Sequence, residues 1–226
     1  MSIFSDVSKY NNKLRPDRVT AKTGKCPTSK RILEAATKEF ANKGYAGARI
    51  NEIARQAKIN KAMIYYHIGD KEALYNTVLS STFGNMAAAM GKNIIWDKQP
   101  AENLHIYIQT ISEAIRENPQ IPPIMLREAA SGGKNLPEEV IQALTIILEI
   151  MAQILKQGVG KNEFHPASSF MIHFMIAGPL IFLQQMEALI HQQINILGPE
   201  NIISQWPDDI CEEIETLIFR ALSKKG

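Results

Sequence analysis

The stretch that decides the fold is INEIARQAKINKAMIYYH, residues 50–67. The apolar residues of its first half have the spacing of one helix face, at Ile50, Ile53, Ala54 and Ala57. Lys58-Ile59-Asn60 predicts a tight turn, and Asn60 can cap a second helix by accepting a bond from a backbone N–H two or three residues on. That second helix ends at His67. Two short helices across such a turn predict a helix-turn-helix, whose second helix enters the DNA major groove.

A longer pattern surrounds this stretch: RILEAATKEFANKGYAGARINEIARQAKINKAMIYYHIGDKEAL, residues 31–74. It contains an Ile-Leu-x-Ala-Ala start, a Phe before a Lys-Gly-Tyr corner, Ile-Ala in the next helix, and Tyr-Tyr-His followed by Asp-Lys-Glu-x-Leu. With these elements in fixed order, residues 28–80 resemble the DNA-binding domain of the TetR (tetracycline-repressor-like) family. The resemblance implies an all-α fold, with an N-terminal three-helix DNA-binding domain followed by a C-terminal helical bundle.

Two positions depart from the family pattern. Lys58 occupies a turn position that is usually Gly, and a left-handed Lys there is expected to cost roughly 1 kcal/mol relative to Gly. Ala48-Arg49 replaces the Thr or Ser that usually caps the first helix of the motif. Loss of a capping side chain costs about 0.5–2 kcal/mol. Neither departure excludes the fold.

The charge of the chain is divided unevenly. Of 226 residues, 45% are hydrophobic and 21% are charged, as in globular proteins. Residues 1–80 hold 15 Lys/Arg and 7 Asp/Glu, a balance of +8, whereas residues 81–226 hold 10 and 16, a balance of −6. A basic N-terminal third joined to an acidic remainder is typical of a nucleic-acid-binding module attached to a second domain.

The compartment is expected to be the cytoplasm. Cys26 and Cys211 are far apart and have no metal-ligand spacing, which indicates free thiols in a reducing environment. The N-terminus lacks the apolar run of a signal peptide. Residues 170–183 come nearest to a membrane span, but they are too few and Gly178-Pro179 interrupts them. We therefore expect no membrane partner.

Three regions are expected along the chain. Residues 1–27 are basic and polar and predict a flexible arm, which either stays a loose extension or follows DNA. Residues 28–75 form the DNA-binding domain, and residues 76–226 form a helical ligand-binding and dimerisation domain. Periodicity predicts about nine helices, near residues 29–42, 50–57, 61–67, 71–95, 101–118, 122–131, 138–157, 167–190 and 207–224.

Several helix ends have specific signals. Thr28 or Ser29 is expected to cap the first helix, and Gly44 to end it. Asp70 is expected to cap the fourth helix. Gly158-Val159-Gly160 predicts the end of the seventh, and Pro179 predicts a kink or a lost hydrogen bond in the eighth.

DNA contacts are expected from two sets of residues. The second helix of the motif is expected to contact base edges or phosphates through Lys61, Ala62, Tyr65 and Tyr66. The small side chain of Ala62 permits close approach and can touch a thymine methyl group. Contacts that position the DNA backbone are expected from Thr28, Arg49, Asn51, His67 and Lys71, with Asn60 between the two sets as the cap. The family resemblance also assigns Lys71 to a phosphate.

The C-terminal helices carry two further predictions. A pocket for a small apolar or aromatic ligand, uncharged or weakly charged, is predicted around Phe83, Met86, Met90, Tyr107, Met125, Met151 and His173. The resemblance implies a four-helix dimer interface, with apolar stripes at Phe174, Gly178, Ile181, Phe182, Gln185 and Leu189 and at Ile210, Ile214, Leu217, Ile218 and Ala221. Both sets of residues are equally compatible with ordinary core packing.

An enzymatic function has almost no support in the sequence. It contains no Gly-rich phosphate loop and no G-x-S-x-G elbow, and its His and Glu residues form no convincing metal set, so we expect no cofactor and no metal. The interpretation is a DNA-binding transcriptional regulator, most simply a repressor that binds a palindromic operator as a homodimer and is released by a ligand. The alternative is a helical architectural DNA-binding protein without a ligand.

Overall fold

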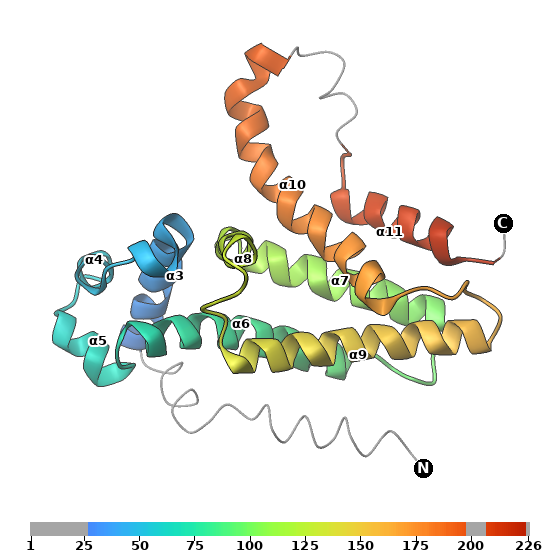
Figure 1. Ribbon diagram of the computed structural model, residues 1–226, viewed down its shortest axis with the longest axis horizontal. Coiled ribbons are helices and arrows are strands. Elements are labelled where there is room, and N and C mark those ends of the chain that lie inside the picture. Colours follow the sequence, from blue (N-terminus) through green and yellow to red (C-terminus); the bar gives the residue numbers. More distant parts are fainter. Residues whose placement is uncertain (1–26, 198–206, 225–226) are drawn as a thin grey trace. The chain divides into compact units, whose positions relative to one another are not determined.

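A computed structural model describes residues 27–197 and 207–224, except for the side chains of Gln184 and residues 187–197. Within these ranges it contains nine helices, α3 to α11, and one isolated antiparallel bridge between Phe164 and Ser223 (Figure 1). The predicted all-α fold is confirmed. Apart from Pro27, the predicted N-terminal arm lies outside the described residues.

The chain forms two compact units, of which the first comprises residues 1–88 and 118–146. Its described helices are α3 (Pro27–Gly47), α4 (Ile50–Gln56), α5 (Lys61–His67), most of α6 (Lys71–Asn93), α8 (Ile121–Ala130) and the start of α9 (Glu138–Gly160). Helix α3 contacts α4 and α8, and α4 contacts α5. The predicted boundary at residue 75 falls inside α6, so these units divide the chain differently from the predicted domains.

An aromatic cluster forms the centre of the first unit. The Phe40 and Tyr75 rings meet edge to face with centroids 4.8 Å apart, and Tyr45 packs on Tyr75 at 4.9 Å. The buried Tyr75 hydroxyl donates a 2.8 Å hydrogen bond to the Glu128 carboxylate of α8. Arg127, also on α8, donates to the carbonyl oxygens of residues 41 and 42 near the end of α3. Helix α8 is thereby fastened to the helices that support the motif.

The second unit comprises residues 89–117 and 147–226. It contains α7 (Pro100–Glu117), α10 (Ser169–Leu197), α11 (Ile210–Leu222) and parts of α6 and α9. Helices α7, α10 and α11 contact one another. His105 of α7 pairs with Glu215 of α11 across 2.6 Å. After α11, the Lys224 backbone N–H donates to the carbonyl of Glu163, so the end of the described chain is held against the loop before α10.

The predicted cap of the first helix was wrong, and two helices extend beyond their predicted last residues. Helix α3 is already helical at Pro27, so Thr28 and Ser29 lie in its first turn and do not precede it. Helix α9 ends at Gly160, within the predicted terminating segment Gly158-Val159-Gly160, although Gly158 itself is still helical. Gly158 is closely packed, since a Cβ there would lie 2.1 Å from the Phe164 ring. Helix α10 contains Pro179 in its interior, as predicted, and continues to Leu197, beyond the predicted end near residue 190.

Candidate nucleic-acid interface

The predicted helix-turn-helix is present as α4, a turn and α5. Ile53, Ala54 and Ala57 are buried on one face of the first helix. In the turn, Lys58 has φ 53°, the left-handed conformation for which Gly is best suited. The N–H of Ile59 then donates to the Ala54 carbonyl at 3.0 Å. The turn is therefore closed by backbone hydrogen bonds although it lacks Gly.

The helix starts around the motif differ in how they are capped. The Asn60 side chain accepts a 2.9 Å bond from the Ala62 N–H, which confirms the predicted cap of α5. Asp70 accepts from the Ala73 N–H at 2.9 Å and caps α6 in the same way. Arg49 precedes α4 and makes no capping bond with its side chain, as expected where the Thr or Ser is missing.

Helix α5 buries a single residue, Ile64, half-buries His67 and presents its other side chains to solvent. The exposed fractions are 38% for Met63, 48% for Tyr65 and 83% for Tyr66, and Lys61 and Ala62 are also exposed. The Lys61 ammonium lies over the Tyr65 ring, 5.6 Å from its centroid. Met63 was missed by the sequence reasoning, although its place directly before the inward-facing Ile64 indicates a position on the flank of the helix.

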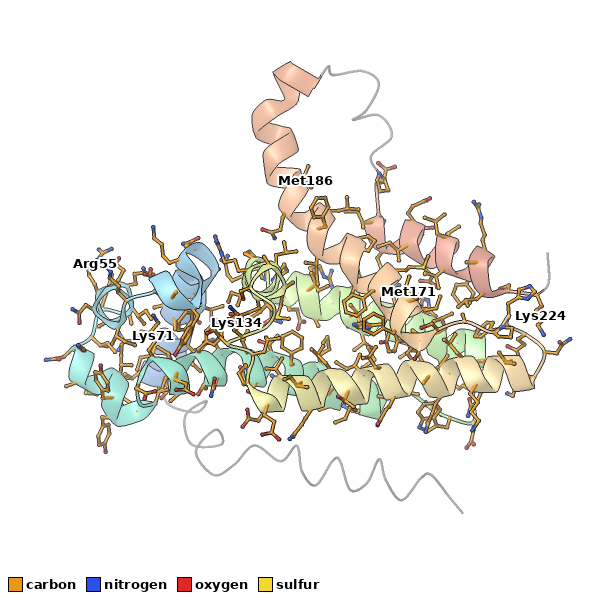
Figure 2. The ribbon with its side chains drawn as sticks, viewed as in Figure 1. Arg55, Lys71, Lys134, Met171, Met186 and Lys224 are labelled. Carbon is orange, nitrogen blue, oxygen red and sulfur yellow. The ribbon has the colours of Figure 1, made fainter. Side chains whose placement is uncertain are left out.

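Polar side chains of α4 are tied to one another. Arg55 pairs with Glu52, and the hydrogen bond from Arg55 lowers the pKa of the Glu52 carboxyl. Gln56 donates to Glu39 of α3 at 3.0 Å and to Glu52 at 3.4 Å. The predicted contact residues Arg49 and Asn51 are exposed, whereas Thr28 is half-buried. Figure 2 labels Arg55 on this helix.

The motif and its flanks are basic. Residues 43–71 hold six Lys or Arg and two Asp or Glu. Among these cations, Lys71, labelled in Figure 2, is engaged within the unit. Its ammonium donates to the Ala46 carbonyl at 3.1 Å and lies 4.9 Å from the Tyr45 ring centroid. An exposed helix on a basic scaffold has the shape and the charge that the DNA major groove requires.

The sequence of the motif matches a known family. Residues 32–78 fit the family described as "Bacterial regulatory proteins, tetR family". The chain belongs to the TetR family. The family resemblance drawn from residues 28–80 is therefore confirmed, and the chain is a helix-turn-helix transcriptional regulator, not an enzyme.

Relatives of this TetR-family chain carry regulatory names. The transcriptional repressor NicS of Pseudomonas putida is 33% identical over 139 residues, which are 61% of this chain and 66% of NicS. The transcriptional regulator RutR of Escherichia coli K12 is 27% identical over 161 residues, 70% of this chain and 76% of RutR. The structure of HlyIIR, a hemolysin II transcriptional regulator, matches 88% of this chain and 98% of its own with a TM-score of 0.60 and 26% identity.

The residues predicted to contact a ligand are divided between the two units of the TetR-family chain. Phe83, Met86 and Met125 belong to the first unit, and Met86 and Met125 are only half-buried there. The other four belong to the second unit and are buried: Met90, Tyr107, Met151 and His173. Tyr107 Oη and His173 Nδ1 share a 2.7 Å hydrogen bond, so the two polar groups satisfy one another. Burial raises the pKa of Tyr107 and lowers that of His173 to about 4.

Among the described residues of the second unit, a larger and a smaller pocket lie open, and neither contains a predicted ligand residue. The larger has a volume of about 660 Å³. Its wall includes His105 and Gln109 of α7, Glu215 and Arg220 of α11, and Asp209. The smaller, of about 280 Å³, lies at the end of α9 and the start of α10, with Leu155, Lys156 and Pro166 in its wall.

The predicted dimer residues separate into two groups. Ile214 and Ile218 are 6% and 1% exposed within the chain itself, so they belong to the core of the second unit and present no surface to a partner. Phe174, Phe182 and Leu217 are each more than half exposed. The remainder are half-buried (Gly178, Ile181, Gln185 and Ile210), exposed (Ala221) or, for the Leu189 side chain, outside the described residues.

The described residues contain neither a membrane-spanning helix nor a cluster of metal ligands. No helix among them is long and apolar enough to cross a membrane. Within residues 27–197 and 207–224, no three His, Cys, Asp or Glu side chains are grouped as metal ligands. Cys211 is free and buried, and burial raises the pKa of its thiol.

Proposed function

We propose that this TetR-family regulator is a repressor that binds a near-palindromic operator as a homodimer and leaves it when a small apolar ligand binds. The observation that carries the proposal is helix α5, which is anchored by Ile64 alone and directs Lys61, Ala62 and Tyr66 to solvent within a basic segment. Two such helices in a dimer would enter successive major grooves, about 34–36 Å apart. The protein would act where its DNA is, in the cytoplasm.

An exposed apolar face on α10 supports the homodimer. Phe170, Met171, Phe174, Met175 and Phe182 are each between 45% and 56% exposed in the single chain. They recur at helical spacing along α10, and large apolar side chains gathered on one face mark interaction sites in soluble proteins. A second copy presenting the same face would cover them in a self-complementary contact.

The ligand is proposed to bind among the helices of the second unit. Met90 and Met151 are adaptable apolar side chains there, and the Tyr107–His173 pair is neutral and can exchange its internal hydrogen bond for one to a ligand. This composition favours an uncharged apolar compound over a phosphorylated one. A hundredfold loss of operator affinity requires a coupling free energy of about 2.7 kcal/mol, within the usual range for allostery.

The test begins with selection of duplexes from a random-sequence library by the full-length protein. Titration calorimetry with apolar compounds then follows, with and without the selected duplex. The proposal expects each effective compound to bind more weakly in the presence of DNA, by the factor by which it weakens DNA binding. Tight DNA binding that no compound changes would favour the architectural alternative. Failure to enrich any duplex would overturn the DNA-binding function itself.

A further inference from the structure

We propose that α5 recognises its operator mainly through thymine methyl groups, by apolar contact from Ala62, Met63 and Tyr66, and not through bidentate hydrogen bonds to purines. The inference rests on the proposed function, because it names the base chemistry that the same helix reads. The proposal concerns contacts to the bases. Contacts to phosphates orient the protein on the duplex but do not distinguish one base from another.

The side chains that form bidentate hydrogen bonds with bases are already engaged in the motif. Arg or Lys reads guanine and Asn or Gln reads adenine in this way. Within residues 50–67 the one Arg and the one Gln are bound by carboxylates, Arg55 by Glu52 and Gln56 by Glu39 of α3. Arg49 is exposed, but it immediately precedes α4, the helix that crosses the DNA backbone. Asn60 uses its side-chain oxygen to cap α5. Asn51 is exposed, but it lies on α4, the helix that crosses the DNA backbone.

The one Lys or Arg side chain of α5 is also restrained. Lys61 is four residues before Tyr65, and its ammonium lies over that ring at 5.6 Å from the centroid. Contacts of this kind hold a cation against an aromatic face with about 0.5–1 kcal/mol at an exposed site. Lys61 therefore supplies at most one donor position, for a guanine or a phosphate, and leaves the other base pairs of the half-site to other side chains.

Apart from the Tyr65 and Tyr66 hydroxyls and the half-buried His67, what remains on the exposed surface of α5 is apolar. Met63 is 38% exposed, Tyr66 is 83% exposed, and Ala62 between Lys61 and Met63 is exposed as well. In the major groove, the thymine 5-methyl group is the apolar feature that distinguishes base pairs. Removing one such group and its partner from water is worth about fourfold in affinity, the equivalent of one buried methylene. The unbranched Met63 side chain can adjust to the position of a methyl group.

Deoxyuridine scanning tests the inference directly. In the selected duplex, each thymidine is replaced in turn by deoxyuridine, which removes the 5-methyl group and keeps the hydrogen-bonding edge. We expect at least one position in each half-site to lose about fourfold in affinity for the full-length protein. We expect Met63→Ala to bind more weakly and to lose part of this discrimination. If every deoxyuridine duplex binds as tightly as its thymidine parent, the readout by methyl contact is wrong.

A matched variant controls for the loss of an exposed apolar side chain. Leu126 on α8 of the same unit is also 38% exposed, and Leu126→Ala should retain the full preference for thymidine over deoxyuridine. Both variants should melt close to the parent, because neither residue is in the core. The two proposals fail separately: absence of any enriched duplex overturns the proposed function, whereas an enriched duplex that is indifferent to deoxyuridine overturns only the methyl readout.

Discussion

The ammonium group of Lys71 lies 4.9 Å from the centroid of the Tyr45 ring. It also donates a 3.1 Å bond to the carbonyl oxygen of Ala46. A Lys in the first turn of a helix is unfavourable for the helix dipole. At this position the side chain turns back toward the segment after Gly44 and joins the end of α3 to the start of α6, four residues after the end of α5. Its effect on stability must therefore be separated from any contact with DNA.

Lys71→Met separates the two roles, because it retains most of the side-chain length and loses the charge. We expect a loss of about 1 kcal/mol in the free energy of unfolding, from the aromatic contact and the hydrogen bond together. We also expect weaker binding to all duplexes and a salt-dependence slope reduced by about 0.9, the value of one phosphate contact. Fluorescence anisotropy over a range of salt concentrations measures the slope. An unchanged slope would restrict Lys71 to its structural role.

The left-handed turn residue gives a second prediction. Lys58→Gly should stabilise the protein by about 0.5–1 kcal/mol, because Gly adopts φ 53° without the steric penalty that Lys carries. Asn162, with φ 60°, is the matched control, since Asn tolerates this conformation better than Lys. Asn162→Gly should change the melting temperature less than Lys58→Gly. Equal effects of the two substitutions in thermal melts would contradict strain at Lys58.

The buried histidine predicts a dependence of stability on pH. Burial lowers the pKa of His173 from 6.5 to about 4. Between these values the unfolded chain binds a proton that the folded chain excludes, so this residue makes stability fall as pH decreases from about 6.5 toward 4. Urea unfolding at pH 7 and pH 5 should show a smaller loss for His173→Gln than for the parent. His165→Gln, at an exposed site, is the control and should lose as much as the parent.

The apolar face of α10 predicts the oligomeric state. Phe182→Glu or Phe174→Glu places a charge in the proposed seam, where burial without a partner costs several kcal/mol. Because both residues are more than half exposed in the single chain, the variants should still fold. Analytical ultracentrifugation should show monomers, and affinity for the selected duplex should fall with dimerisation. A dimer that tolerates both changes would place the interface elsewhere.

Patterns that depend on local chemistry were predictable from the sequence. The positions of α4 and α5, the Asn60 cap, the Asp70 cap and the uncapped start of α4 at Arg49 all follow from residues close to one another in the chain. Each cap bonds a backbone N–H two or three residues further along the chain, so the sequence alone is enough to predict it.

Features that depend on distant partners were not predictable in the same way. Gly158 indicates a helix end, and its close packing against the Phe164 ring is not evident from the sequence. The stripe on α11 looks uniformly apolar, yet Ile214 and Ile218 are buried while Leu217 is half exposed, because α7 and α10 cover only part of the helix. Lys71 was expected to be directed at phosphate, and the carbonyl that it contacts lies 25 residues earlier in the chain.

In α5, the residue buried in the core is not one of the residues proposed to contact bases. Ile64 holds the helix in place, while Ala62, Met63 and Tyr66 contribute little to the core. Substitutions at these three positions can accumulate with little loss of stability, so under the proposed readout the operator preference of this scaffold can drift in evolution or be redirected by design. Asn60 has no such freedom, because a new residue there would have to cap the helix as well.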